Sequence, residues 1–183
     1  MSSNNNDLLI LVDDDDQEIG TLSKQECHAK EGVLHRAFSL FVFNRNGELL
    51  LQQRSANKPL WPLFWSNSCC SHPRQSESIE LAAQRRIFEE LGFECNSKYL
   101  YKFKYHARYL NEGCEHELCH VLIGYCDNPI SANKEEVAAW RYVTPKNLDH
   151  ELDSTPEFFT PWFKLEWQHI KAHYLQAILA NYP

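Results

Sequence analysis

Residues 79–92 have the pattern of an amphipathic helix with a defined end. Apolar side chains recur at positions i, i+4 and i+8, at Ile79, Ala83 and Ile87, so they form one stripe that can pack inward. Gly92 follows the last expected turn, where glycine commonly ends a helix in the left-handed conformation. The pattern therefore predicts a helix that lies against a core and keeps its other faces open to solvent or to a ligand.

The polar face of this expected helix carries charges that suit a metal ion held against a diphosphate. Arg86 and Glu90 are four residues apart and share a face, with Glu89 at its edge. Either Ser76 or Ser78 can cap the start of the helix. Taken alone, the same pattern also describes a solvated surface helix with an Arg–Glu pair. The residues around the helix are needed to choose between the two interpretations.

Short apolar runs on both sides of the helix predict strands. The expected strands cover residues 37–43, 48–53, 99–109, 117–125 and 138–143. Residues 44–47 form the turn of a first hairpin, and residues 111–113 form the turn of a second. After Thr160 and Pro161, a cap followed by a proline, one long helix is expected to about Leu179. Strands with a helix inserted mid-chain, followed by a terminal helix, predict a mixed α/β fold.

Composition and charge limit the classes of partner. The chain has 183 residues, 43% of them hydrophobic, which suffices for one domain with a sizeable core. The net charge of −7 argues against nucleic acid as the main partner, because duplex phosphates need a basic face. No apolar run long enough for a membrane span and no signal peptide are present, so a cytoplasmic location without membrane attachment is expected.

The cysteines predict reduced thiols rather than a disulfide framework. Their number is seven, which is odd, and their spacing is irregular. Cys114 and Cys119 are close enough to suggest zinc, but no second close pair completes a structural zinc site.

Side chains of metal-binding type stand at three separate places in the sequence. Glu115 and Glu117 are two residues apart, and in a strand both carboxylates would point to the same face, where a cation relieves their repulsion. His28 and His35 are seven residues apart, with a glycine between them, and His72 is followed by proline. Each of these residues alone is more often a surface or core residue, and their spacing does not join them.

The central helix and the residues before it resemble the Nudix box. In that motif a glycine is followed at fixed spacing by Glu, then Arg-Glu, then Glu-Glu and Gly. The matching positions are Glu77, Arg85, Glu89, Glu90 and Gly92, with Ser71 in place of the first glycine. Arg86 replaces the second glutamate, which Nudix hydrolases use in a cluster that holds several metal ions. A cation at this position disfavours hydrolysis as the function.

With this arginine, and with Cys70 shortly before the helix, the chain resembles the type 1 isopentenyl-diphosphate isomerases, which are Nudix-fold enzymes. The resemblance runs from about Leu8 to the terminal helix. It implies an α/β/α sandwich around a mixed β-sheet, with N- and C-terminal extensions. We expect a single domain over residues 1–183 in which residues 1–7 are a disordered tail. The expected protein is a monomer or weak dimer that acts on a small-molecule diphosphate.

The resemblance also implies two metal positions. Three histidines and two glutamates match the family's first site: His28, His35, His72, Glu115 and Glu117. Manganese, iron, zinc or magnesium suits such a set, and the residues do not select among them. Glu90 and the backbone carbonyl of Cys70 match the ligands of a second ion, a magnesium carried by the substrate. Neither flavin nor NAD is expected, because the reaction has no redox step and the chain has no glycine-rich dinucleotide loop.

The implied reaction is the reversible conversion of isopentenyl diphosphate to dimethylallyl diphosphate. Cys70 and Glu117 match the acid–base pair, and Tyr105 is expected close to Glu117. Four cations match the positions that bind the diphosphate: Lys24, Arg54, Lys58 and Arg86. Trp162 matches the aromatic ring that faces the carbocation. The other interpretation is that Trp162 packs in the core at the start of a helix.

The sequence leaves two other functions open. A Nudix hydrolase of a nucleoside diphosphate derivative would leave Cys70 and His72 without a role. A non-catalytic metal-binding or regulatory module on the same scaffold would make the acid–base pair incidental. Release of phosphate distinguishes the first from an isomerase, and the absence of turnover with metal restored distinguishes the second.

Overall fold

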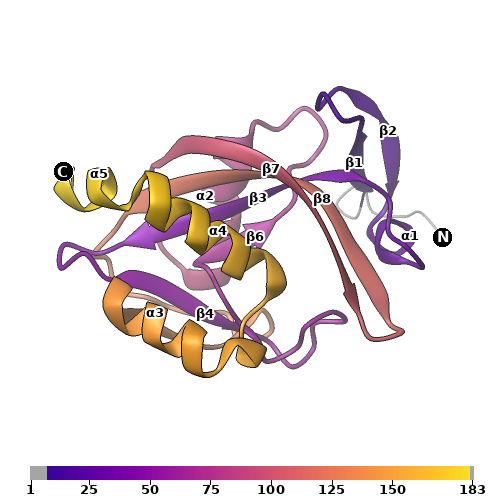
Figure 1. Cartoon of the computed structure of the whole chain (residues 1–183). Coiled ribbons are helices and arrows are strands. Elements are labelled where there is room, and N and C mark those ends of the chain that lie inside the picture. The colour runs from indigo at the N-terminus through magenta and orange to yellow at the C-terminus, as the bar shows by residue number, and fades with distance from the viewer. Residues whose placement is uncertain (1–7, 182–183) are drawn as a thin grey trace.

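One mixed β-sheet with helices on both faces organises the protein (Figure 1). The computed structural model describes residues 8–181, so the expected tail at residues 1–7 lies outside the described residues. The strands are β1 (Leu8–Val12), β2 (Glu18–Ser23), β3 (His35–Phe43), β4 (Leu49–Arg54), β5 (Trp65–Ser66), β6 (Cys69–Ser71), β7 (Ser97–Tyr109), β8 (Gly113–Tyr125) and β9 (Val137–Val143). The helices are α1 (Lys24–His28), α2 (Ile79–Leu91), α3 (Pro145–Ser154), α4 (Pro161–His173) and α5 (Leu175–Ala180), with a 3-10 turn η2 (Pro156–Phe158).

Strand β3 is the centre of the sheet. It runs parallel to β8 over its whole length, from His35 opposite Glu117 to Phe43 opposite Tyr125. Strands β1, β4 and β6 pair with β3 in the antiparallel sense. The long hairpin β7–β8 extends the sheet on one side, and β9 extends it beyond β4. Residues from distant parts of the sequence therefore meet around β3.

Alternate side chains of β3 enter two cores on opposite faces of the sheet. Phe41 and Phe43 pack in one core with Phe163 of α4. Leu40 packs in the other core with Ile87 of α2. Figure 1 shows α4 on one side of the sheet and α2 on the other. The α/β/α arrangement implied by the family resemblance is confirmed.

Helix α2 begins and ends where the sequence predicts. Ser78, not Ser76, is its cap, and the Ser78 hydroxyl accepts the backbone N–H of Leu81 at 3.2 Å. Gly92 has a φ of 76° at the other end. A Cβ atom at Gly92 would lie 2.8 Å from the carbonyl oxygen of Ser131, so both backbone conformation and space require glycine here.

The expectation of one long terminal helix to about Leu179 is wrong. Helix α4 ends at His173 and α5 begins at Leu175, and Tyr174 between them has φ −128° and ψ −24°. The Tyr174 ring stacks on Tyr101 of β7, with ring centroids 5.7 Å apart and planes 4° from parallel. A contact with the sheet thus accompanies a break that the helical pattern does not signal.

Other elements differ in extent from the sequence expectation. Strand β8 begins at Gly113 rather than at Glu117, because the β7–β8 ladder continues almost to the turn. This places Glu115 inside the strand. The short elements α1, β5 and β6 and the helix α3 were not predicted. None of the helices within residues 8–181 is both long and apolar enough to cross a membrane.

Candidate active site

Cys70 lies on β6, directly opposite Ser39 of β3. Its thiol donates to the Asn67 side-chain oxygen at 2.7 Å and accepts the indole N–H of Trp162 at 3.3 Å. Burial raises the pKa of the Cys70 thiol to about 12, so the thiol keeps its proton at neutral pH. The neighbouring Cys69 points to the opposite face, into the core beneath α2. Of the two adjacent thiols, only Cys70 lines a cavity.

Five predicted metal ligands come together from four places in the fold. His28 ends α1, His35 begins β3, His72 follows β6, and Glu115 and Glu117 project from the same face of β8. Their donor atoms all lie within 4.8 Å of one another. The parallel pairing of β3 with β8 sets His35 opposite Glu117. The fold thus assembles the group that sequence spacing could not join.

The hydrogen bonds of the histidines fit a divalent metal. The Nδ1 atoms of His28 and His35 lie 2.6 and 2.7 Å from backbone carbonyl oxygens, which can only accept. These Nδ1 atoms therefore carry the protons, and both Nε2 atoms present lone pairs to the cluster. The Nε2 atoms of His35 and His72 are 3.2 Å apart, and His28 Nε2 is 2.8 Å from Glu115 Oε2. Lone pairs facing each other at these distances are the arrangement that a metal ion stabilises.

Glu117 connects the metal ligands to Tyr105. Its Oε1 lies 3.0 Å from His72 Nε2, and its Oε2 accepts the Tyr105 hydroxyl at 2.6 Å. Burial acts to raise the pKa of Glu117, but the neighbouring His35 and His72 side chains hold this pKa well below its usual range. Burial lowers the pKa of His72 to about 3, so its imidazole is neutral, as a metal ligand must be. Burial and the nearby Glu117 keep the Tyr105 phenol protonated by raising its pKa.

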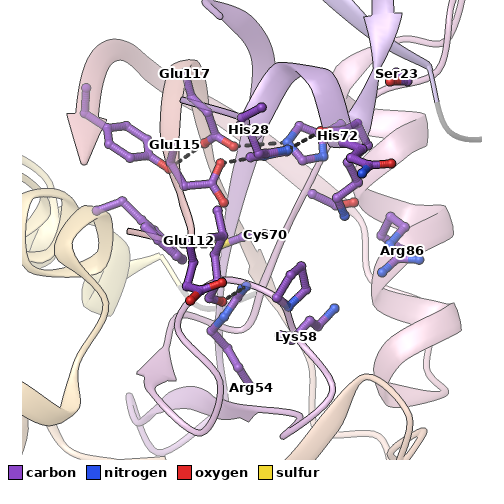
Figure 2. A pocket seen from close by; sticks show the side chains of 18 residues that line it. Ser23, His28, Arg54, Lys58, Cys70, His72, Arg86, Glu112, Glu115 and Glu117 are labelled. Atoms are coloured by element: carbon purple, nitrogen blue, oxygen red, sulfur yellow. Dashed lines mark hydrogen bonds and ion pairs between the residues drawn. The ribbon is translucent and has the colours of Figure 1, made fainter. Parts of the chain in front are cut away.

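A cavity of about 630 Å³ joins these groups to the predicted phosphate-binding cations. Figure 2 shows Glu115 and Glu117 above Cys70, with Arg54 and Lys58 below it. The predicted residues that line the cavity are Lys24, His28, Arg54, Lys58, Cys70, His72, Arg86, Tyr105, Glu115, Glu117 and Trp162. One cavity therefore combines a thiol, a metal-ligand cluster, an aromatic wall and a cationic end.

Arg54 is held in place by the loop after β4. Its guanidinium donates to the carbonyl oxygens of Trp61 and Leu60, at 3.0 and 2.9 Å. The same group lies 5.3 Å from the centre of the Trp162 ring. Because no carboxylate neutralises Arg54 among the ion pairs of the described residues, its charge is available to an anion in the cavity.

Lys58 and Arg86 share a carboxylate that the sequence interpretation overlooked. Glu136 forms a close ion pair with Lys58 and lies 3.3 Å from an Arg86 nitrogen. Burial acts to raise the pKa of Glu136, but the hydrogen bond and charge of Lys58 and the charge of Arg86 lower it to about 2. Lys24 is nearby and exposed as a residue, but partial loss of solvent around its amine and the charge of Lys58 lower its pKa. Glu136 thus forms ion pairs with Lys58 and Arg86, two of the cations that we predicted to bind the diphosphate.

Replacing Glu136 with glutamine is expected to tighten binding of inorganic pyrophosphate by about tenfold at low ionic strength. The variant removes a negative charge that competes with the anion for Lys58 and Arg86. Calorimetric titration of both proteins with magnesium pyrophosphate measures the effect. The neighbouring Glu135→Gln, an exposed position, makes the same charge change and is the control. Weaker binding in the Glu136 variant would mean that this carboxylate positions the cations instead of competing for them.

The carboxylates of α2 are paired with arginines. Glu77 is bound by Arg85, and Glu90 lies in an ion pair with Arg86 and accepts a hydrogen bond from Gln52 at 3.0 Å. Glu90 is buried and does not line the 630 Å³ cavity. Its expected part in holding a substrate-borne magnesium stays a prediction. The cluster of three histidines and two glutamates lies instead on α1, β3 and β8, and after β6.

Several residues near the site were missed from the sequence. Ser39 and Asn67 contact the Cys70 thiol, and Glu136 contacts two cavity cations. Glu166 lies fully buried on α4, behind the site. Only Glu166 carried a local signal, because a carboxylate one position before Trp167 falls on the apolar side of its helix. The partners of the other residues are far away in sequence.

Comparison with known proteins gives the family. Residues 33–163 match the family model described as the NUDIX domain. A Photorhabdus laumondii protein named Isopentenyl-diphosphate Delta-isomerase 1 is 43% identical over 162 residues, which cover 87% of this chain and 92% of that protein. This chain belongs to the isopentenyl-diphosphate Delta-isomerase family. A Schizosaccharomyces pombe member is 38% identical over 181 residues, covering 85% of this chain and 78% of its own.

Solved structures show the same fold at lower identity. A Deinococcus radiodurans protein superposes with a TM-score of 0.65 at 22% identity and covers 81% of this chain and 90% of its own. The MutT protein of Methanosarcina mazei reaches a TM-score of 0.63 at 17% identity, over 76% and 94% of the two chains. The resemblance to Nudix-fold isomerases is confirmed at the level of family and fold. Helix α1, which carries Lys24 and His28, lies before the residues that match the NUDIX model.

Proposed function

We propose that this protein interconverts isopentenyl diphosphate and dimethylallyl diphosphate. The observation that carries the proposal is one cavity in which Cys70, Glu117 and Trp162 stand together, in a chain of the isomerase family. The reaction adds a proton to the terminal alkene carbon and removes one from the adjoining methylene. Two proton-exchanging groups and a cation-stabilising wall are therefore required in one enclosed site.

The two proposed acid–base groups differ in protonation. Burial keeps the Cys70 thiol protonated, whereas the neighbouring His35 and His72 side chains keep Glu117 ionised. An alkene bound between them meets a proton donor on one strand and an acceptor on another. Because the reaction is reversible, each group serves as acid in one direction and as base in the other. Tyr105 holds the Glu117 carboxylate through its 2.6 Å hydrogen bond.

The flat aromatic wall suits the charge that develops in the reaction. Protonation of the alkene produces a tertiary carbocation, and the Trp162 ring can stabilise it by about 2 kcal/mol when water is excluded. Trp162 is buried, and its indole N–H donates to Ser66 at 3.2 Å as well as to the Cys70 thiol. These two bonds fix the ring beside the thiol.

The proposed reaction would use metal ions at two positions. His28, His35, His72, Glu115 and Glu117 would hold a divalent ion, manganese, iron, zinc or magnesium, that tunes the acidity of Glu117. Glu90 and the Cys70 carbonyl would help to hold a magnesium carried by the diphosphate. Lys24, Arg54, Lys58 and Arg86 would bind the diphosphate oxygens. Neither flavin nor NAD enters the proposed reaction.

We also propose a domain organisation, an oligomeric state and a location for the protein. We infer a single domain over residues 1–183 that works as a monomer or weak dimer in the cytoplasm, because the composition and net charge suit none of the nucleic-acid or membrane partners. A small-molecule diphosphate is the proposed partner. Sedimentation analysis would measure the oligomeric state.

Solvent deuterium should enter the new methyl group of dimethylallyl diphosphate during turnover. The protein is incubated with isopentenyl diphosphate and magnesium in deuterated water and followed by proton NMR, because both proposed acid–base groups exchange with solvent. A chelator is expected to stop the reaction. Phosphate release without isomerisation would identify a hydrolase. No reaction with metal bound would identify a non-catalytic module.

A further inference from the structure

Glu166 is a buried carboxyl that the proposed reaction does not yet use. It lies on α4 with none of its surface exposed, and it forms no ion pair among the described residues. Its Oε2 atom has no hydrogen-bond partner within the part of the chain that the structure describes. An ionised carboxylate in such a place is very costly, and the group avoids this cost by keeping its proton.

Short contacts connect Glu166 to the Cys70 thiol. Its Oε1 accepts the Cys119 thiol at 3.5 Å, and the Cys119 sulfur lies 3.4 Å from the Ser39 hydroxyl. The Ser39 hydroxyl in turn lies 3.4 Å from the Cys70 sulfur. Strand pairing fixes this path, because Ser39 stands opposite Cys70 of β6. Glu166 is therefore connected to the Cys70 thiol through the Cys119 thiol and the Ser39 hydroxyl.

Within residues 8–181, no cation forms an ion pair with Glu166. The titratable groups that interact with it electrostatically are Cys70 on β6, Cys119 and Glu117 on β8, and Tyr101 on β7. Burial raises the pKa of Glu166 to about 8, against the opposing effect of the nearby Ser39 hydroxyl and Cys119 thiol, and the charge of Glu117 acts in the same direction as burial. Glu166 is thus neutral at pH 7 and ionises in mildly alkaline solution.

We propose that Glu166 is a positioning residue for isomerisation, which supports Cys70 through Ser39 while protonated and inactivates the site when it loses its proton. This inference rests on the proposed function. When the Cys70 thiol gives up its proton, a negative charge forms on sulfur. A second negative charge behind it, in a medium of low dielectric constant, opposes that step. Turnover is therefore supported below the pKa of Glu166 and falls as the pH rises through it.

The Glu166→Gln variant provides the main test, because glutamine keeps the shape of the neutral acid but cannot ionise. In the wild type, kcat is expected to fall about tenfold per pH unit above pH ~8. The variant should keep kcat at pH 7 within a few-fold, keep KM, and show no such alkaline fall. Glu157→Gln, at an exposed position just before α4, is the charge-matched control and should retain the wild-type profile. An alkaline fall that is identical in wild type and Glu166→Gln would overturn the proposal.

Ser39→Ala tests the connection itself. It should lower kcat several-fold at pH 7 without changing KM, since it removes the hydroxyl between Glu166 and Cys70. Unchanged kcat in this variant would contradict the path through Ser39.

Infrared spectroscopy in deuterated buffer observes Glu166 without requiring turnover. The carbonyl band of a protonated carboxylic acid should be present in the wild type at pH 7, disappear on titration near pH 8, and be absent from Glu166→Gln. If the wild type lacked this band at pH 7, Glu166 would be ionised and the inference would fail. If the band titrated as expected but the wild type did not isomerise its substrate, the proposed function would fail instead.

Discussion

Cys70→Ala is expected to lower isomerase turnover by roughly 10³-fold or more, whereas Cys69→Ala should leave most of it. The two residues are neighbours, but β6 sends their side chains to opposite faces of the sheet. Cys70 lines the cavity beside Trp162, and Cys69 packs beneath α2. Alanine at position 69 removes one small buried group and costs stability rather than catalysis.

Both cysteine variants would be assayed for turnover with metal saturated, and their thermal unfolding would be compared with that of the wild type. An electrophilic analogue of the substrate should modify Cys70 in the wild type and in Cys69→Ala, as mass spectrometry of the digested protein would show. Equal and mild losses of turnover in the two variants would remove Cys70 from the acid–base pair.

Glu117→Gln should reduce turnover by ~10²- to 10⁴-fold and weaken metal binding, while Glu115→Gln should mainly weaken metal binding. Both carboxylates face the same three histidines, so either substitution removes a ligand. Only Glu117 also accepts the Tyr105 hydroxyl, and only Glu117 was assigned a proton-transfer role. Glutamine preserves the size of the side chain but cannot accept the proton.

Elemental analysis of the purified variants, together with turnover after metal is added back, separates these two roles. Added metal should restore much of the activity of Glu115→Gln and little of that of Glu117→Gln. Full restoration in Glu117→Gln would leave this residue as a ligand alone. Tyr105→Phe provides a further comparison, because it removes the hydroxyl and leaves both carboxylates in place.

Local patterns in the sequence predicted the parts of the fold that depend on local chemistry. Helix α2 was predicted with its correct end at Gly92, because glycine is the residue that the left-handed conformation requires there. The common face of Glu115 and Glu117 followed from strand periodicity. The break at Tyr174 was missed because it accompanies ring stacking against a distant strand, which leaves no trace in a helical pattern.

The candidate site also combines features that could be predicted from the sequence with features that only the fold explains. Spacing alone could not bring His28 and His35 to one point, and their grouping depended on the family resemblance. In the structure it is explained by the short helix α1 and by the pairing of β3 with β8. Glu136 and Glu166 were missed because their significance comes from what lies beside them, Lys58 in one case and Cys119 in the other. Neither neighbour is close to them in sequence.

The position of α1 has a consequence for how the N-terminal segment is attached to the rest of the protein. His28 lies before the part of the chain that matches the NUDIX model, whereas Glu115 lies far inside it. An ion bound by both would join α1 to β8, and because these ligands come together only in the folded chain, its binding would stabilise the folded state. Metal occupancy and the docking of α1 and of the antiparallel strands β1 and β2 would then be coupled. Demetallation would loosen the amino-terminal portion first and expose it to proteases.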